Sequence, residues 1–203
     1  MPLSPLLANF FLRPFDLEVE KINVSSIRYA DDLILFFKDK QSARDGLSFV
    51  SEQLQKLKLL VPKLEDVDSK TELVGPREPV IFLGFEIAYD EQSSSYVRKI
   101  PKKVRNKILA EFRKFGDLNY CIKRKMDLFK LERRLHGMLH SYDSFYEPAV
   151  DWSRFNVRVR VEAERARERV FEELFGKNAL TKLTAEKLDF LKLRELTFDT
   201  GDY

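Results

Sequence analysis

The first twenty residues carry apolar side chains at the spacing of one broad helix face. This stripe is typical of an amphipathic helix, and it consists of Leu6, Leu7, Phe10, Phe11 and Phe15. Ser4 followed by Pro5 predicts the helix start, with serine as the N-cap and proline at the first helical position, where its missing N–H costs nothing. We expect this helix to run to about Glu20.

Two short runs with strand-forming side chains follow, separated by a pair of adjacent acids. Residues 25–28 and 33–37 contain β-branched and aromatic side chains, which favour buried strands. Asp31 and Asp32 therefore lie at the tip of a predicted hairpin. An ordinary turn rarely needs two neighbouring acids, because like charges repel and burial raises their cost, whereas two carboxylates suit divalent metal ions in phosphoryl transfer. Aspartate is also a common turn former, so this run alone leaves a structural role open.

Helix and strand signals alternate in the rest of the first hundred residues. An amphipathic stripe at helical spacing predicts a helix that opens at residues 42–45, and it is formed by Leu47, Val50, Leu54 and Leu57. After it we expect an irregular acidic segment over 61–68, a strand over 70–74, a strong strand over 79–87, a polar turn over 90–95 and a return strand over 96–100.

The chain after Pro101 is predicted to be all helical. The expected helices cover residues 102–115, 122–140, 151–175 and 184–196, with breaks near Gly116, Gly137, Pro148 and Gly176. The sequence therefore predicts an α+β front half to about residue 100, followed by a helical back half over 101–203.

Composition narrows the class of protein. The chain has 203 residues, of which 44% are apolar and 34% are charged, so it can form a core and we expect it to be soluble. It contains neither a run of about 18 apolar residues nor a signal-peptide pattern. Cys121 is the single cysteine and cannot form an internal disulfide, and the chain has no Cys/His spacing of a metal site. A cytoplasmic location is the expectation.

Positive charge is concentrated in one block. Residues 98–134 hold 14 Lys or Arg against 4 Asp or Glu, although the net charge of the whole chain is only +3. Aromatic residues interleave this block, namely Phe112, Phe115, Tyr120 and Phe129. Such a block suits contact with a nucleic-acid backbone, but lysine and arginine are also common on solvated helix faces, and composition does not decide between the two.

Three segments, in this order and spacing, resemble the reverse transcriptases of bacterial retroelements (the group II intron, retron and defence-associated class). Residues 2–12 resemble the family's helix-opening motif, and residues 28–32, Arg-Tyr-Ala-Asp-Asp, resemble its metal-binding hairpin. Residues 82–85, Phe-Leu-Gly-Phe, resemble its primer-gripping hairpin. Lys70-Thr71 fits an intervening lysine motif, although the stretch before it is longer and more acidic than the family pattern. The resemblance covers roughly residues 2–100.

The resemblance implies a role for each motif in an RNA-directed DNA polymerase. Asp31 and Asp32 would be the catalytic residues and would ligate two Mg²⁺ ions for nucleotidyl transfer to a primer 3′-hydroxyl. Tyr29 and Ala30 would lie against the terminal nucleotide of the primer. Lys70 would lie near the leaving pyrophosphate, or would form a salt bridge on a loop.

Further implied contacts involve the first helix and the second hairpin. The pocket around the new base pair would be shaped by Ser4, Pro5 and Asn9, with capping and packing as the alternative for the first two. The primer-gripping turn would comprise Phe82, Leu83 and Gly84, where glycine either permits close approach of the primer or marks an ordinary bulge.

The helical half fits the family's thumb by its position and charge. Its first helix would follow template–primer phosphates through Lys102, Lys103, Arg105 and Lys107. The implied organisation is a partial polymerase palm of antiparallel strands and helices over residues 1–100, followed by an all-helical, thumb-like region over 101–203. The implied partners are an RNA template, a DNA primer and deoxynucleoside triphosphates.

One departure from the family pattern matters for activity. In the family, a Pro-Gln-Gly turn, a strand with another catalytic aspartate and the fingers precede the helix motif, and this sequence contains none of them. We therefore expect the C-terminal part of a longer, truncated or split polymerase, with an incomplete two-Mg²⁺ site and little activity by itself. The missing half, as a separate chain, is one candidate partner.

Two alternatives to the polymerase stay open. The chain could instead be a non-catalytic nucleic-acid-binding module. Its helical half would then bind RNA or DNA, and the acidic pair would be vestigial. The chain could also be a remnant derived from a reverse transcriptase, without a function of its own.

Overall fold

A computed structural model describes residues 3–64, 66, 69–178, 180–184 and 187. The regular elements of the described residues are helices and two small antiparallel sheets, so the predicted α+β class is compatible with the structure. The chain divides into two compact units, Met1–Leu83 and Gly84–Tyr203. The described residues contain no helix both long and apolar enough to span a membrane.

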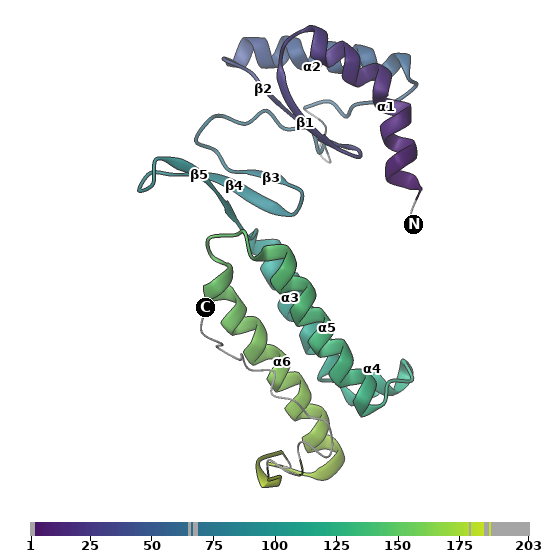
Figure 1. Cartoon of the computed structure of the whole chain (residues 1–203), viewed down its shortest axis with the longest axis vertical. Helices are drawn as coiled ribbons and strands as arrows, with labels where there is room; N and C mark the ends of the chain where they lie inside the picture. The colour runs from purple at the N-terminus through teal and green to yellow at the C-terminus, as the bar shows by residue number, and fades with distance from the viewer. Residues whose placement is uncertain (1–2, 65, 67–68, 179, 185–186, 188–203) are drawn as a thin grey trace. The chain divides into compact units, whose positions relative to one another are not determined.

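The first unit contains helix α1 (Ser4–Lys21), strands β1 (Ser25–Tyr29) and β2 (Asp32–Phe36), and helix α2 (Lys40–Lys56). The two strands form an antiparallel hairpin, and its position beside the helices can be followed in Figure 1. Leu33 and Leu35 of β2 pack against a small buried cluster. This cluster comes from both helices and consists of Phe15, Val19 and Val50. The hairpin is therefore covered by helices on one face.

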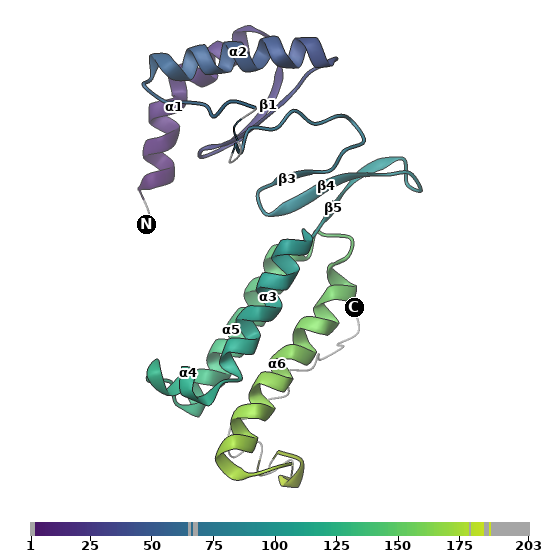
Figure 2. The ribbon, with the colours of Figure 1, turned by 180° about the vertical axis from the view of Figure 1, so that it is seen from behind.

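Helix α1 ends one residue beyond the predicted Glu20, but its start differs from the prediction. Leu3 is the cap residue and makes no side-chain cap hydrogen bond, while Ser4 is already helical. Pro5 lies in the first turn, where its missing N–H has no partner to lose. Pro14 lies inside the helix and removes a backbone hydrogen bond. The helix changes direction along its length in both views (Figures 1 and 2), as expected for an internal proline.

Helix α2 begins two residues before the predicted start because of a cap at Asp39. The Asp39 carboxylate accepts hydrogen bonds from the backbone N–H of Ser42 at 2.8 Å and from its hydroxyl at 2.8 Å. The strand predicted over residues 70–74 is wrong, since the described backbone there is irregular. Leu73 and Val74 are half-buried, but the described strands do not pair with this segment.

A three-stranded sheet follows, with the order β3 (Val80–Phe82), β4 (Phe85–Asp90) and β5 (Ser95–Lys99). The single strand predicted over residues 79–87 is wrong, because Leu83 and Gly84 form a two-residue turn. Their φ angles are 49° and 82°, and positive φ at both central residues is the pattern of a type I′ hairpin turn. The polar turn and the return strand are confirmed by the pairing of β4 with β5.

The helical part consists of α3 (Lys102–Phe115), α4 (Leu118–Lys123), α5 (Leu128–Tyr146) and α6 (Trp152–Phe175), with a short 3₁₀ turn at Leu180–Lys182. The predictions for residues 102–115 and 151–175 are confirmed to within one residue. The helix predicted over 184–196 lies outside the described residues, apart from residues 184 and 187.

The single helix predicted over residues 122–140 is wrong. The chain breaks at Lys125, whose φ is 53°, and Asp127 caps a new helix by accepting from the backbone N–H of Lys130 at 2.7 Å. That helix continues past Gly137 to Tyr146, because packing outweighs the weak helix propensity of one glycine. Its neighbours Leu135 and Leu139 are buried in the core.

Helices α3, α5 and α6 lie side by side in both views (Figures 1 and 2) and enclose the main core. Phe112, Leu135 and Val159 have no exposed surface. Phe85 of β4 extends this core, since its ring stacks on Phe145 of α5 at a centroid distance of 5.3 Å. The β4–β5 hairpin is therefore anchored to the helices by aromatic packing.

Charged residues are also buried between α5 and α6. The Glu132 carboxylate is 8% exposed and lies 3.9 Å from Nη1 of Arg167, which also forms an ion pair with Glu164. Burial raises the pKa of Glu132 to about 7, although the positive charge of Arg167 acts in the opposite direction. This carboxyl group is therefore a source of pH-dependent stability in the second unit.

Candidate functional site

The two predicted catalytic acids lie at the loop of the first hairpin. Tyr29 and Asp32 form the last residue pair of the β1–β2 ladder, and Ala30 and Asp31 form the two-residue loop between them. Asp31 and Asp32 are exposed, and the Tyr29 side chain is 64% exposed. The turn thus presents two adjacent carboxylates and an aromatic ring to solvent.

Arg28 ties this turn to helix α1. Its guanidinium donates from Nε to Asp16 Oδ1 at 2.7 Å, and its Nη2 donates to the other carboxylate oxygen of Asp16. Its Nη1 donates to Asn9 Oδ1 at 3.1 Å and to the backbone carbonyl of Ala30 at 2.8 Å. The bond with Asp16 raises the pKa of Arg28 above its ordinary value, against a smaller opposing effect of burial. Arg28 is therefore permanently charged and held by three different residues.

Ala30 has an unusual backbone conformation for a residue with a side chain. Its φ is 54°, in the left-handed region that costs about 1–2 kcal/mol for a residue with a β-carbon. Positive φ at the first loop position alone is the sign pattern of a type II′ turn, where glycine is usual. The surrounding contacts must therefore stabilise this turn.

The donor set of the turn fits a Mg²⁺ ion that is shared with a substrate. Mg²⁺ is commonly held by one or two carboxylates together with phosphates and water, rather than by a cage made only of protein groups. Asp31 and Asp32 supply two exposed carboxylates. Among the described residues, no group of three or more His, Cys, Asp or Glu side chains could hold a metal ion. A complete metal site would need further donors.

The α1 residues predicted to shape the nucleotide pocket are exposed. Ser4 and Pro5 lie in the first turn of the helix, and Asn9 lies one to two turns further along. The Asn9 side chain accepts a hydrogen bond from Arg28, so it is already linked to the acidic turn. Around these residues the helix exposes apolar side chains, and Phe10 is 77% exposed.

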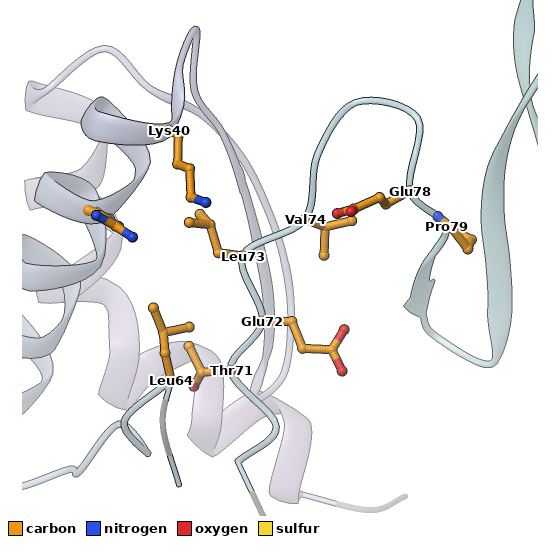
Figure 3. Close-up of a pocket in the computed structure, with 9 residues that line it drawn as sticks. Lys40, Leu64, Thr71, Glu72, Leu73, Val74, Glu78 and Pro79 are labelled. Carbon is orange, nitrogen blue, oxygen red and sulfur yellow. The ribbon is translucent and has the colours of Figure 1, made fainter. Parts of the chain in front are cut away.

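Lys70 lies on the irregular segment after α2 and is exposed. The residues that follow it line an open hollow of about 560 Å³ beside α2 (Figure 3). Lys40, Leu64, Thr71 and Leu73 are among the lining residues labelled in this view. The hollow mixes basic and acidic side chains with apolar ones and includes neither Asp31 nor Asp32. Lys70 therefore directly precedes the residues that line this hollow.

The turn predicted to grip a primer is the tight turn between β3 and β4. Phe82 ends β3, and Leu83 and Gly84 make the turn itself. A β-carbon on Gly84 would lie 3.6 Å from the Phe145 ring and 3.8 Å from the Tyr146 hydroxyl, which are ordinary contact distances. The positive φ of Gly84, and not a lack of space, is what favours glycine here.

The four basic residues predicted to contact phosphates divide into two kinds. Lys102, Lys103 and Lys107 are exposed on α3. The Arg105 guanidinium instead donates from Nε to the Ile100 carbonyl at 2.9 Å and forms an ion pair with Asp151. Arg105 thus helps to join the start of α6 to the end of β5, and the three lysines stay exposed on α3.

Other basic residues of the helical unit stack on aromatic rings. Arg124 lies 4.8 Å from the Tyr120 ring centroid, and Arg133 lies 5.8 Å from that of Phe129. Such pairs present a flat cation and a ring together, which suits nucleic-acid bases as well as phosphates. The alternation of basic and aromatic residues in this part of the sequence is the signal that indicates these cation–π pairs.

Sequence reasoning missed the role of Arg28 and its partner Asp16. The two residues are 12 positions apart, and an isolated arginine in a strand gives no sign of its partner. The available signal was the spacing of Asn9 and Asp16. Polar residues seven positions apart lie on the same face of a helix.

A family model described as "Reverse transcriptase (RNA-dependent DNA polymerase)" matches residues 1–87. The match includes the acidic turn, the helix before it and the turn at Leu83 and Gly84. No curated protein matches the chain.

Proposed function

We propose that this chain is part of an RNA-directed DNA polymerase of the reverse transcriptase type. The observation that carries the proposal is the pair of exposed carboxylates, Asp31 in the hairpin loop and Asp32 at the start of β2, in a turn that Arg28 ties to α1. The match of the family model to residues 1–87 supports it. Neighbouring carboxylates on a rigid support are what nucleotidyl transfer requires.

Asp31 and Asp32 are the residues that would hold Mg²⁺ in the proposed enzyme. The bound metal would supply charge neutralisation at the phosphates of an incoming nucleotide and activation of the primer 3′-hydroxyl. Tyr29 offers an exposed ring for stacking on the terminal primer nucleotide, and Ala30 keeps the loop small. The exposed start of α1, with Ser4 and Pro5, would border the new base pair.

The second unit would bind the template–primer backbone. Lys102, Lys103 and Lys107 are exposed cations on one helix, which suits contact with phosphates. The turn at Leu83 and Gly84 would lie against the primer. In this assignment residues 1–100 form part of the palm, and residues 101–203 act as the thumb.

The chain by itself should have little polymerase activity. Two carboxylates leave much of the coordination of Mg²⁺ to other donors, and the described residues place no third carboxylate with Asp31 and Asp32. We propose that the missing donor comes from outside the described residues. Robust Mg²⁺-dependent primer extension by the purified chain, abolished by Asp31→Ala, would overturn this low-activity expectation and support the polymerase.

Metal-directed cleavage tests the proposed site without requiring turnover. Fe²⁺ bound in place of Mg²⁺, with ascorbate and peroxide, should cut the chain close to residues 31 and 32. Excess Mg²⁺ should suppress the cut. A template–primer with the matched nucleotide should strengthen it, because substrate phosphates complete the coordination of the metal.

Variants at the turn provide the controls. Asp31→Asn and Asp32→Asn should lose the cut. Glu91 is an exposed acid in the turn between β4 and β5, and Glu91→Gln should retain the cut. Equal cutting of the wild type and both aspartate variants would contradict the metal site. Equal stimulation by matched and mismatched nucleotides would contradict a templated polymerase.

The stacked and exposed basic residues support a second candidate, a non-catalytic nucleic-acid-binding module. Here the affinity for a template–primer would not depend on Asp31 or Asp32. Replacing Lys102, Lys103 and Lys107 together by glutamine should reduce the salt dependence of duplex binding by about 2–3 in the log–log slope, because each phosphate contact contributes about 0.9. A matched triple replacement of Lys21, Lys38 and Lys58 in the first unit should leave that slope unchanged.

A further inference from the structure

The side chain of Arg28 gathers acceptors from helix α1 and from the acidic turn. Both oxygens of Asp16, the Asn9 side-chain oxygen and the Ala30 carbonyl accept hydrogen bonds from it. The Arg28 side chain is only 13% exposed, although Asp31 and Asp32 beside it are exposed. One half-buried residue thus connects the helix to the turn at which both carboxylates lie.

We propose that Arg28 is a positioning residue, which sets the conformation of the Ala30–Asp31 peptide and thereby the direction of the two carboxylates. The part of this inference that concerns metal rests on the proposed function of the turn. The part that concerns the loop conformation does not.

The contact with the Ala30 carbonyl is the central link in this proposal. That carbonyl belongs to the peptide group that joins Ala30 to Asp31, so its orientation also orients the backbone of Asp31. Ala30 holds a φ of 54° without being glycine, and such a conformation persists only where the surroundings hold it. The 2.8 Å bond from Arg28 Nη1 is a contact that can do so.

Helix α1 provides the fixed reference for Arg28. Asn9 and Asp16 are seven residues apart and therefore lie on one face of the helix. Asp16 grips the guanidinium through both of its oxygens, which fixes the plane of the group as well as its position. Nη1 is then directed at Asn9 and Ala30 together.

Asp16 also leaves the turn acids available for a metal ion. An unpaired arginine three or four positions before Asp31 and Asp32 would be attracted to them and would compete with a cation. Because Asp16 already neutralises the Arg28 charge, the guanidinium can orient the loop without occupying its carboxylates.

The geometry also indicates why lysine would not serve at this position. The guanidinium is planar and donates in several fixed directions, whereas an ammonium group is a compact charge without a fork. Arg28→Lys therefore keeps the positive charge and the ion pair with Asp16 but loses the simultaneous contacts with Asn9 and Ala30. This variant separates positioning from charge.

The test compares Arg28→Lys with the wild type in the full chain by two measurements. The backbone ¹³C shifts of Ala30 report its φ angle, and the binding of Mn²⁺, followed through water proton relaxation, reports the carboxylates. We expect Arg28→Lys to move the Ala30 shifts away from the left-handed values. We expect it to weaken Mn²⁺ binding about 10–100-fold, as is typical when a supporting partner of metal ligands is lost.

Three further variants define the result. Arg28→Ala should give at least the same loss as Arg28→Lys, and Asp16→Asn should move the Ala30 shifts less than Arg28→Lys does, because the amide still accepts one hydrogen bond. Lys21→Gln breaks an exposed ion pair with Glu18 on the same helix and should change neither measurement. The melting temperature of Arg28→Lys should stay close to that of the wild type, which distinguishes positioning from loss of fold.

Wild-type Ala30 shifts in Arg28→Lys would overturn the inference, and so would wild-type Mn²⁺ affinity in that variant. If Arg28→Ala does not fold, the Ala30 shifts and the Mn²⁺ affinity of Arg28→Lys still test the inference. The proposed function fails in a different way, through unchanged Mn²⁺ binding in Asp31→Asn and Asp32→Asn. In that case the Ala30 shifts still show whether Arg28 sets the loop.

Discussion

Buried apolar side chains form one continuous core in the described part of residues 84–203, whereas the described part of residues 1–83 has only a small cluster around Phe15, Val19 and Val50. Among the described residues, the larger core contains eighteen buried side chains. The first unit instead exposes large apolar residues on α1, such as Leu6 and Phe10. Because burial of apolar surface is the main stabilising term in folding, the second unit should be the more stable.

The exposed basic residues and the candidate metal-binding turn therefore belong to different units. The unit with the larger core carries exposed lysines and stacked arginines on a stiff set of helices. The unit with the smaller core carries the acidic turn, and a single arginine holds that turn in place. A turn that rests on so few contacts is more sensitive to substitution than a helix face.

The largest expected effect comes from removing a core ring in each unit. Phe112→Ala in the second unit should lower the free energy of unfolding by about 3–5 kcal/mol, because the ring is fully buried. Urea unfolding followed by the fluorescence of Trp152, the single tryptophan, measures that unit. Phe129→Ala, an exposed position on α5, should change it by less than about 0.5 kcal/mol.

The same experiment in the first unit can break the comparison. Phe15→Ala should unfold residues 1–83 more readily, as measured by amide hydrogen exchange, while the Trp152 transition stays where it is. A Trp152 transition that moves as far with Phe15→Ala as with Phe112→Ala would mean that the two units unfold together.

The pH dependence of stability should come in part from Glu132 in the second unit. The pKa of Glu132 is raised from 4.5 to about 7 in the folded protein. Its contribution is therefore fully present below pH 4.5 and is lost as the pH rises to about 7, because the unfolded chain releases the proton more readily. Glu132→Gln should remove this loss and stabilise the protein at pH 8 by up to about 3 kcal/mol.

Trp152-monitored urea unfolding at pH 5 and pH 8 measures this effect. The gain from Glu132→Gln should be large at pH 8 and small at pH 5. Glu173→Gln, an exposed acid on α6, provides the control and should follow the wild type at both values. An equal gain at both pH values would show that the effect of Glu132→Gln does not come from titration.

The smallest expected effects come from a pair of helical glycines, one in each unit. A β-carbon on Gly46 of α2 would lie 2.1 Å from the end of the Phe37 ring, whereas one on Gly137 of α5 would meet nothing within 4 Å. Gly46→Ala should therefore destabilise the first unit by about 1–3 kcal/mol. Gly137→Ala should stabilise the second unit by about 0.5–1 kcal/mol.

Thermal unfolding followed by circular dichroism, together with hydrogen exchange of α2 amides, measures this pair. A lower free energy of unfolding for Gly46→Ala and a higher one for Gly137→Ala would sharpen the contrast. Gly46 lies on a helix crowded by the Phe37 ring, whereas Gly137 lies on an open helix face. A neutral Gly46→Ala would mean that the Phe37 ring moves aside without loss.

Local signals in the sequence were sufficient for elements with a strong pattern. Residues 102–115 show a clear stripe between a proline and a glycine, and the structure has a helix with those bounds. The hairpin around Asp31 and Asp32 was equally clear, because Ile27 and Tyr29 precede the acids and a run of Leu, Ile and Phe follows them. The expectation for residues 79–87 failed, because a continuous apolar run does not reveal a turn that depends on positive φ at Leu83 and Gly84.

The sequence by itself determined which residues form the candidate site and the order in which they occur. Tertiary structure alone decided which of them are available. It committed Arg105 to Asp151, left Lys102, Lys103 and Lys107 exposed, and brought Arg28 between Asp16 and the Ala30 carbonyl. Such contacts join residues 2 to 46 positions apart. Periodicity and composition describe neighbours along the chain, and partners across space depend on how helices and strands pack.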